Sequence, residues 1–365
     1  MNLLSSTSIF SFFTIISRIL GYLRDILIAI FLGASIFADA FFVAFRLPNT
    51  FRRLFAEGTF NAAFIPSYTS FKLNSKQTGK TFADDVLSLL VIILLVIVTL
   101  AEVFTPLLVY IIAPGFIDDN TKFSLAVEFT RITFPFLLFV SLSSFFSGIL
   151  NSNNKFAAAA AAPIILNIIL IISILVAYFQ DLNIAKQLSY GVTLAGIIQL
   201  LFLIYFTYKF YKPNLKFNFK ISRKVKFFFK RLLPSIFSSG VTQINILVGT
   251  IIASFQTGAV SYLYYADRVY QINLAIAGIA VGTVSLPVLS KALKSKNFSN
   301  VSNIQNKSIQ LSLLLSIPAS MGLVIAADEI INGLFGYGSF TIEDVRLTSK
   351  ALMFFGLGVV AFALV

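Results

Sequence analysis

The sequence lacks cysteine, histidine and tryptophan altogether, and only 12% of its 365 residues are charged. Without cysteine and histidine, a disulfide framework, the usual zinc, haem and iron–sulfur sites, and a thiol or imidazole catalytic pair are excluded. The scarcity of charge excludes a water-soluble enzyme, because soluble domains carry about 25% charged residues. Hydrophobic residues make up 58% of the chain, and the mean hydropathy is +0.89. These values predict an all-α polytopic membrane protein.

Ten segments are long and apolar enough to form membrane-spanning helices of about 20 residues or more. The first is not a cleaved signal peptide, because Arg18, Arg24 and Asp25 interrupt it and no small-residue cleavage site follows. The last runs to Val365 without a polar flank, which favours an incomplete reading frame or the loss of further helices. The segments lie near residues 6–33, 37–71, 84–113, 122–150, 156–179, 187–208, 231–254, 258–291, 303–327 and 342–365.

Basic residues are distributed unevenly between the two sets of loops. Seventeen Lys and Arg residues lie in one set, against only Lys122, Lys186 and Arg346 in the other. Because cytoplasmic loops carry the excess of Lys and Arg, the first set and the N-terminus are predicted to be cytoplasmic. The net charge of +13 does not indicate nucleic-acid binding, since the cations flank apolar segments and do not form one basic face. The cation-rich loops are 72–83, 151–155, 209–231 and 291–307.

The segment 209–230 is the main candidate for a domain boundary. It separates an N-terminal lobe with six spans, residues 1–208, from a partial C-terminal lobe with four, residues 231–365. Apolar and polar residues alternate between 215 and 221, and the run 223–231 mixes three phenylalanines with cations. This pattern favours a cytoplasmic linker at the interface with anionic headgroups over a plain solvated loop.

Three of the expected spans carry charges within their apolar length. Such ions cost roughly 2.5–3.5 kcal/mol each on insertion scales and mark functional sites. Arginines outnumber acids six to four among them, and a guanidinium binds phosphate through paired hydrogen bonds. We therefore expect spans 1, 2 and 8 to line a water-filled cavity for a phosphate or pyrophosphate ligand. The candidate substrate-binding residues are Arg18, Arg24, Asp25, Asp39, Arg52, Arg53, Glu57, Asp267 and Arg268.

Two other interpretations of these charges stay open. The neighbouring acids and arginines, Arg53 with Glu57 and Asp267 with Arg268, form pairs that hold the bundle together without binding a ligand. The arginines of span 2 serve as interfacial anchors if that span projects beyond the bilayer, because a helix of its 35 residues is about 52 Å long.

Several sequence motifs point to one family. The chain contains the runs SRILGYLRD at 17–25, ADAFFVAFRLPN at 38–49, RRLFAEG at 52–58, YADR at 265–268 and LFGYGSF at 334–340. Together they resemble the MurJ (MviN) family of lipid II flippases in the MOP transporter superfamily, and the resemblance runs the length of the chain. It implies a MATE-like bundle of two six-helix lobes with two further helices, of which about ten of fourteen spans are present here.

The resemblance implies a flippase, not an enzyme, in the bacterial inner membrane. Its substrate would be the undecaprenyl-pyrophosphate-linked peptidoglycan precursor, carried to the periplasmic leaflet by alternating access. The matching arginines would bind the pyrophosphate, with the acids beside them as companions. The expected partners are lipid II, membrane lipids and cell-wall synthesis proteins, with no nucleic acid.

No metal or resident cofactor is expected. The coupling ion, sodium or proton, or the membrane potential in its place, is left open. Family members that use sodium have ligands in span 7, and here that span offers Gln243 and Asn245 but no acid.

Rival functions are compatible with the same architecture. A polysaccharide-repeat flippase of the O-antigen type shares the pyrophosphate-linked lipid and is the main alternative. A drug or cation antiporter would need acids to dominate the cavity, and the count is the reverse. A non-transporting remnant or scaffold is the third possibility.

The predicted topology is testable with single cysteines, because the chain has none of its own. We expect Asn214→Cys to react with an impermeant thiol reagent from the cytoplasmic side and Asp119→Cys from the periplasmic side. Labelling of both positions from the periplasm would contradict the orientation deduced from the basic loops.

Overall fold

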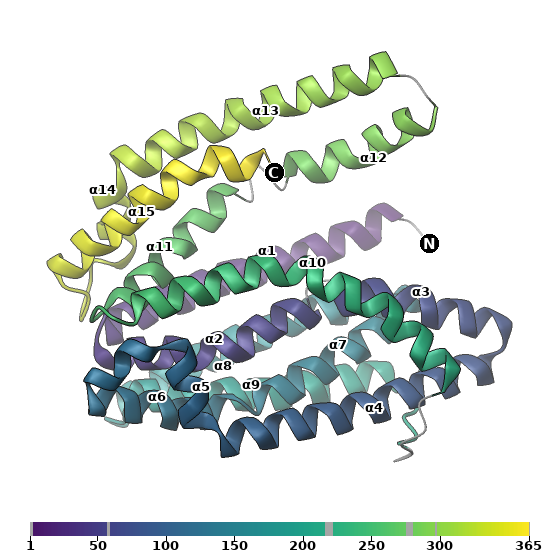
Figure 1. Cartoon of the computed structure of the whole chain (residues 1–365), viewed down its shortest axis with the longest axis horizontal. Coiled ribbons are helices and arrows are strands. Elements are labelled where there is room, and N and C mark those ends of the chain that lie inside the picture. The colour runs from purple at the N-terminus through teal and green to yellow at the C-terminus, as the bar shows by residue number, and fades with distance from the viewer. Residues whose placement is uncertain (1–2, 57–58, 216–221, 275–279, 296–297, 365) are drawn as a thin grey trace. The chain divides into compact units, whose positions relative to one another are not determined.

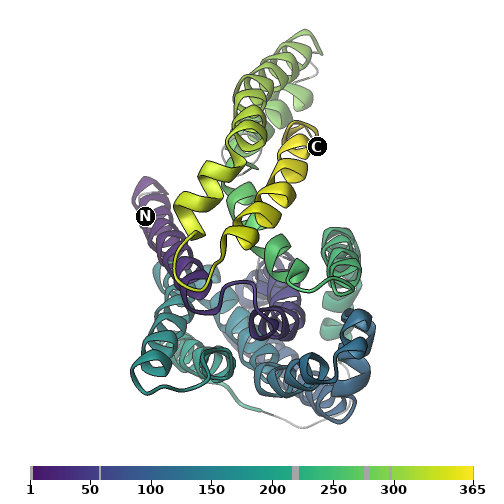
Figure 2. The ribbon, with the colours of Figure 1, turned by 90° about the vertical axis from the view of Figure 1, so that its left-hand side faces the viewer.

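The computed structural model describes residues 3–56, 59–215, 222–274, 280–295 and 298–364, shown in two views in Figures 1 and 2. These residues form helices joined by short turns, and no strand occurs among them. The all-α architecture predicted from composition is confirmed. Helices are expected in a membrane because lipid offers no hydrogen-bond partners, and a helix satisfies its backbone N–H and C=O groups within itself.

The first ten helical elements are between 5 and 30 residues long. They are α1 (Leu3–Leu32), α2 (Ile36–Ala56), α3 (Thr59–Asn74), α4 (Lys76–Val103), α5 (Thr105–Ile112), the 3₁₀ helix η1 (Pro114–Asp118), α6 (Asn120–Thr133), α7 (Phe136–Ser152), α8 (Phe156–Phe179) and α9 (Ile184–Thr207). After residues 208–222 follow α10 (Arg223–Ala253), α11 (Ala259–Leu274), α12 (Ala280–Lys294), α13 (Phe298–Ile325), α14 (Ala327–Phe335) and α15 (Ile342–Ala363).

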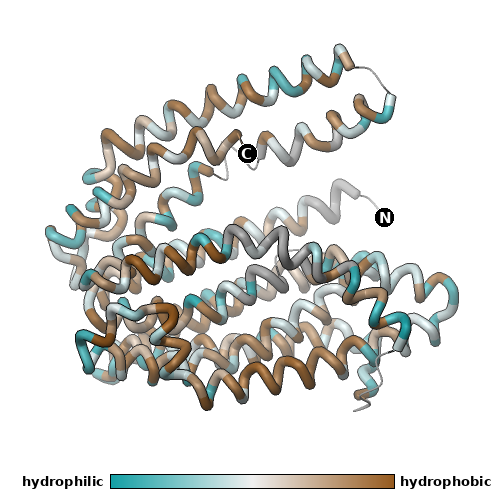
Figure 3. Tube along the Cα trace, in the orientation of Figure 1, coloured by the Kyte–Doolittle hydropathy of each residue, from teal (hydrophilic) through white to brown (hydrophobic). Residues whose placement is uncertain are grey.

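Six helical stretches among the described residues are long and apolar enough to cross a membrane. Each matches one of the ten predicted spans, and Figure 3 shows α4 apolar along most of its length. The other four predicted spans contain the intramembrane charges or residues that the structure does not describe. The six stretches are Lys76–Val103, Asn120–Ser152, Phe156–Phe179, Ile184–Thr207, Phe298–Ile325 and Ile342–Ala363.

The chain divides into two compact units whose boundary differs from the predicted one. The first unit is Met1–Ile28 with Ile36–Thr257, and the second is Ala29–Ser35 with Gly258–Val365. The second lobe was expected to begin at residue 231, but α10 belongs to the first unit throughout its length.

Aromatic packing explains why α10 belongs to the first unit. Phe228 of α10 is 1% exposed, and its ring lies 5.7 Å from Phe60 and 6.0 Å from Phe82. Phe64 joins the same cluster, 5.0 Å from Phe145 of α7. Ring pairs at these separations contribute about 0.5–1.5 kcal/mol beyond the area they bury. The three phenylalanines in the run 223–231 therefore do not all lie at a membrane interface, because Phe228 is part of the hydrophobic core.

The second unit includes the turn between α1 and α2. Tyr265 of α11 is fully buried, and its hydroxyl donates to the Gly33 carbonyl at 3.1 Å. The Ser339 amide donates to the Ile30 carbonyl at 2.7 Å. The loop after α14 thus binds the turn by backbone hydrogen bonds, and Gly33 and Gly338 both adopt positive φ, +58° and +62°.

These contacts predict that Gly338→Ala destabilises the second unit. A Cβ at this position would lie 2.3 Å from the Ile30 carbonyl oxygen, and the left-handed backbone alone costs a non-glycine residue about 1–2 kcal/mol. We expect a lower midpoint temperature for the loss of monodisperse protein in detergent.

Gly333→Ala is the matched control for this substitution. Gly333 lies within α14, and a Cβ added there would meet no other atom within 4 Å, so alanine should stabilise the helix by about 1 kcal/mol. Equal midpoints for the two variants would contradict the close approach of residues 30 and 338.

Candidate functional site

The most buried cation of α1 is held by side chains from two helices. Arg24 donates from Nε and Nη2 to Asp25 Oδ1, at 2.9 and 2.6 Å, and from Nη1 to Asn167 Oδ1 of α8 at 2.9 Å. Asn167 in turn donates from Nδ2 to the Ser17 carbonyl at 2.8 Å. Arg24 and Asp25 are 6% and 3% exposed. The guanidinium is therefore fixed in position inside the bundle, with its charge compensated.

Two further predicted arginines of the first unit are more accessible. Arg18 is exposed on α1, two turns before Asp25 and on the same helix face. Arg52 of α2 is half-buried and donates from Nε to Asn49 Oδ1 at 2.9 Å. The side chain of Arg53 and the whole of Glu57 lie outside the described residues.

Asp39 forms a buried ion pair that connects α2 to α6. Its Oδ2 lies 2.6 Å from Nζ of Lys122, and the two side chains are 0% and 4% exposed. The ammonium also lies 4.1 Å from the ring centroid of Phe116, in cation–π contact. The Asp119 carboxylate caps α6 by accepting from the Thr121 and Lys122 amides, which places Lys122 in the first turn.

The expectation that Lys122 is a loop cation is wrong. Lys122 belongs to the first turn of α6, and burial is tolerated because a carboxylate and an aromatic ring receive the ammonium. The carboxylate that binds it lies 83 positions earlier, so no local pattern pairs the two.

The predicted pair of the second unit, Asp267 and Arg268, lies on α11. Both residues are half-buried. Arg268 donates from Nη2 to the Tyr264 hydroxyl at 3.0 Å, and its guanidinium carbon lies 4.7 Å from the centroid of that ring. Gln271 Nε2 donates to Asp267 Oδ2. Each charge is thus held by a side chain about one turn away on the same helix.

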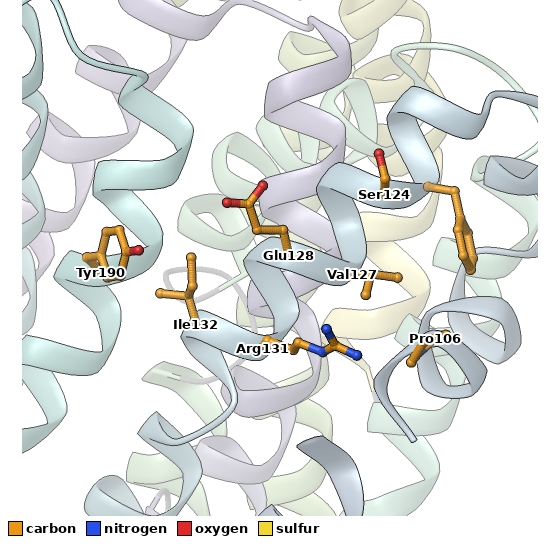
Figure 4. A pocket seen from close by; sticks show the side chains of 8 residues that line it. Pro106, Ser124, Val127, Glu128, Arg131, Ile132 and Tyr190 are labelled. Carbon is orange, nitrogen blue, oxygen red and sulfur yellow. The ribbon is translucent and has the colours of Figure 1, made fainter. Parts of the chain in front are cut away.

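A pocket of about 440 Å³ opens on the first unit between α5, α6 and α9 (Figure 4). Among the side chains that the structure describes, none of the predicted substrate-binding residues lines it. Glu128, on its wall, forms a 2.8 Å ion pair with Lys186, but both side chains are nearly half exposed. Exposed pairs are weak, about 0–1 kcal/mol, so this surface pocket is not the candidate site. Its lining is Pro106, Phe123, Ser124, Val127, Glu128, Arg131, Ile132 and Tyr190.

The acidic side chains do not gather into a metal-binding cluster. Within the described ranges, no three His, Cys, Asp or Glu side chains come together as a group that could hold a metal ion.

Comparison with known proteins identifies relatives of the whole chain. A profile of the family described as "Lipid II flippase MurJ" matches residues 28–365. The chain is 42% identical to "Probable lipid II flippase MurJ" of Rhizobium tropici, over 96% of this chain and 67% of that protein. It is 40% identical to the protein of the same name from Rickettsia prowazekii, over 100% of this chain and 72% of the relative.

The solved structures that resemble this chain include a member of the same family. "Lipid II flippase MurJ, inward closed conformation" matches with a TM-score of 0.84 at 29% identity, covering 97% of this chain and 73% of that one. An inward-facing multidrug resistance MATE family transporter of the MOP superfamily matches with a TM-score of 0.73 at 14% identity, over 95% of this chain and 80% of that one, which shows the fold alone. The two-lobe MOP-type helical bundle expected from the sequence is thus confirmed as a fold class.

The buried pair predicts a large effect of Lys122→Ala on stability. Removing one partner of a buried ion pair costs about 3–5 kcal/mol, because the other charge loses its compensation. We expect the variant to lose monodispersity on heating at a clearly lower temperature. Lys186→Ala, which breaks the exposed pair with Glu128, should change stability by less than about 1 kcal/mol.

A double-mutant cycle separates the pair from other effects of the substitution. Asp39→Asn in the Lys122→Ala background should recover part of the lost stability, because it removes the uncompensated carboxylate. Additive losses in the double variant would show that the two side chains do not stabilise each other.

Proposed function

The chain belongs to the Lipid II flippase MurJ family, and we propose that it moves lipid II from the cytoplasmic to the periplasmic leaflet of the bacterial inner membrane. As a member of this family it is a multi-pass transporter and not an enzyme. The family match over residues 28–365 supports this substrate. So do the relatives at 40–42% identity that bear the flippase name.

The buried arginine of α1 supports a role in binding the pyrophosphate of the substrate. Arg24 is already positioned by Asp25 and Asn167, so little side-chain entropy is lost when it binds a ligand. A phosphate oxygen accepts from the same donors as the Asp25 carboxylate. Exchange between the two acceptors makes binding reversible, as a transporter requires.

The remaining predicted residues take related roles in this proposal. Arg18 and Arg52 in the first unit, with Arg53, contact the anionic head group, and Arg268 of the second unit is a further candidate for phosphate binding. Asp25 compensates Arg24 when substrate is absent, and Glu57 and Asp267 are proposed as companions of the neighbouring arginines. Asp39, being fully buried against Lys122, acts on the helix arrangement.

Orientation and energy supply complete the proposal. The N-terminus is cytoplasmic, following the excess of Lys and Arg in the loops on that side. No resident cofactor takes part. A membrane potential that is negative inside favours outward movement of an anionic head by about 2.3 kcal/mol per charge per 100 mV, and a sodium or proton gradient could supply the same work.

Substitution of Arg24 tests the proposed role. We expect Arg24→Ala to lower the rate of labelled lipid II translocation per reconstituted molecule by about 10- to 100-fold, since hydrogen bonds to charged groups are worth about 1.5–3 kcal/mol. Arg24→Lys should recover only part of the rate because it loses the planar donor set. Arg268→Ala should act in the same direction.

Arg346→Ala is the matched control. Arg346 is an exposed arginine of α15 paired with Glu343 one turn away, and its loss should leave the rate unchanged. If Arg24→Ala reduces the amount of folded protein while the rate per molecule stays at the parent value, Arg24 has a structural role only.

A further inference from the structure

The segment that follows α9 is fixed to the first unit at a buried carboxylate. Asp84 of α4 is 4% exposed, and its Oδ1 accepts from the Tyr211 hydroxyl at 2.6 Å and from the Asn214 amide at 3.1 Å. Burial, with the hydrogen bond to Asp84, raises the pKa of Tyr211 far above its usual value, so the phenol is neutral and donates. The chain just after the membrane helix is therefore held in a defined place.

The start of α10 is fixed to the same core. Val225 and Phe228 are each 1% exposed and belong to the apolar cluster that also includes Tyr211. Tyr211 and Phe64 both contact Phe145, at 5.8 and 5.0 Å between ring centroids, and Phe64 lies 6.2 Å from Phe228. The two described ends of the linker thus pack against one patch of the first unit.

Near the buried residues Tyr211, Val225 and Phe228, other side chains of the same two segments are exposed. They are cations and one phenylalanine. Lys209 and Lys212 are exposed before residue 215, and Arg223, Lys226 and Lys230 are exposed on α10. Phe227, between them, is 47% exposed. We name these six residues the basic linker surface. No Asp or Glu occurs anywhere between residues 209 and 231.

We propose that the basic linker surface binds the headgroups of anionic phospholipids in the bilayer that the chain itself spans. It directly follows α9, a membrane-spanning candidate, so lipid headgroups are the nearest anions. Five exposed cations without an acid complement a negative surface, and exposed Phe227 suits the apolar layer just below the headgroups. A soluble acidic protein would complement the charge but leave this ring without a role.

The absence of tryptophan provides a direct test on the full chain. Phe227→Trp places a single indole fluorophore at an exposed position of the basic linker surface. The protein is reconstituted into nanodiscs of phosphatidylcholine with a minor fraction of phosphatidylglycerol, with brominated acyl chains on one lipid or the other at matched mole fraction. We expect phosphatidylglycerol to be enriched around the introduced indole about fivefold or more. One Lys or Arg near an anionic membrane surface contributes about 1 kcal/mol, which corresponds to that factor.

Removing the charges should abolish this preference. In the Phe227→Trp background, Arg223→Gln, Lys226→Gln and Lys230→Gln together should equalise quenching by the two lipids. The matched control removes three exposed cations elsewhere in the chain, Lys291→Gln and Lys294→Gln at the end of α12 and Lys307→Gln in α13, and should keep the preference. Raising the salt from 0.1 M to 1 M shortens the Debye length from about 10 Å to 3 Å and should weaken it.

Three results would overturn the proposal. They are equal quenching by both lipids in the parent, a preference that survives the triple substitution, and fluorescence that neither brominated lipid quenches. The last would mean that the surface is solvated or covered by something other than lipid. Since the assay measures no transport, its outcome is independent of the proposed flippase activity.

Discussion

The structure depends on one constraint, that an ion enclosed by apolar helices must be compensated by another part of the chain. Asp39 satisfies it with Lys122, and Arg24 satisfies it with Asp25 and Asn167. The first arrangement connects α2 to α6, and the second connects α1 to α8. The charges that are costliest to bury thus also fix which helices lie together.

Aromatic packing, like the ion pairs, determines which helices of the first unit lie together. The chain has 41 phenylalanines, and one contiguous cluster in the first unit contains phenylalanines from α3, α4, α7 and α10, namely Phe60, Phe64, Phe82, Phe145, Phe146 and Phe228. Because rings fill space and are non-polar, a phenylalanine among lysines can be core on one helix face and interfacial on the next. Phe228 and Phe227 are neighbours in sequence with opposite environments, and this explains why α10 packs with the helices before the linker.

For a flippase, compensated arginines have a second consequence. A guanidinium that is already paired does not bind an anion irreversibly, because each new hydrogen bond replaces one to a side chain. Arg24 has this property within the described residues, while exposed Arg18 lies on the same helix. The same helix therefore presents one accessible cation and one that must exchange partners, a graded arrangement suited to taking up and releasing a pyrophosphate head.

The sequence by itself determined the lipid environment, the helical class, six of the ten expected spans and the identity of the charged positions, since these follow from local composition and from contiguous motifs. Arg24, Asp25 and Asp39 were found in this way. Tertiary structure decided which distant residues they meet, Asn167 for Arg24 and Lys122 for Asp39. Lys122 resembled a loop cation and Phe228 an interfacial residue, because burial depends on residues that are distant in the chain. Asp39 and Lys122 are 83 positions apart, and only the packing of α2 on α6 brings a carboxylate to that ammonium.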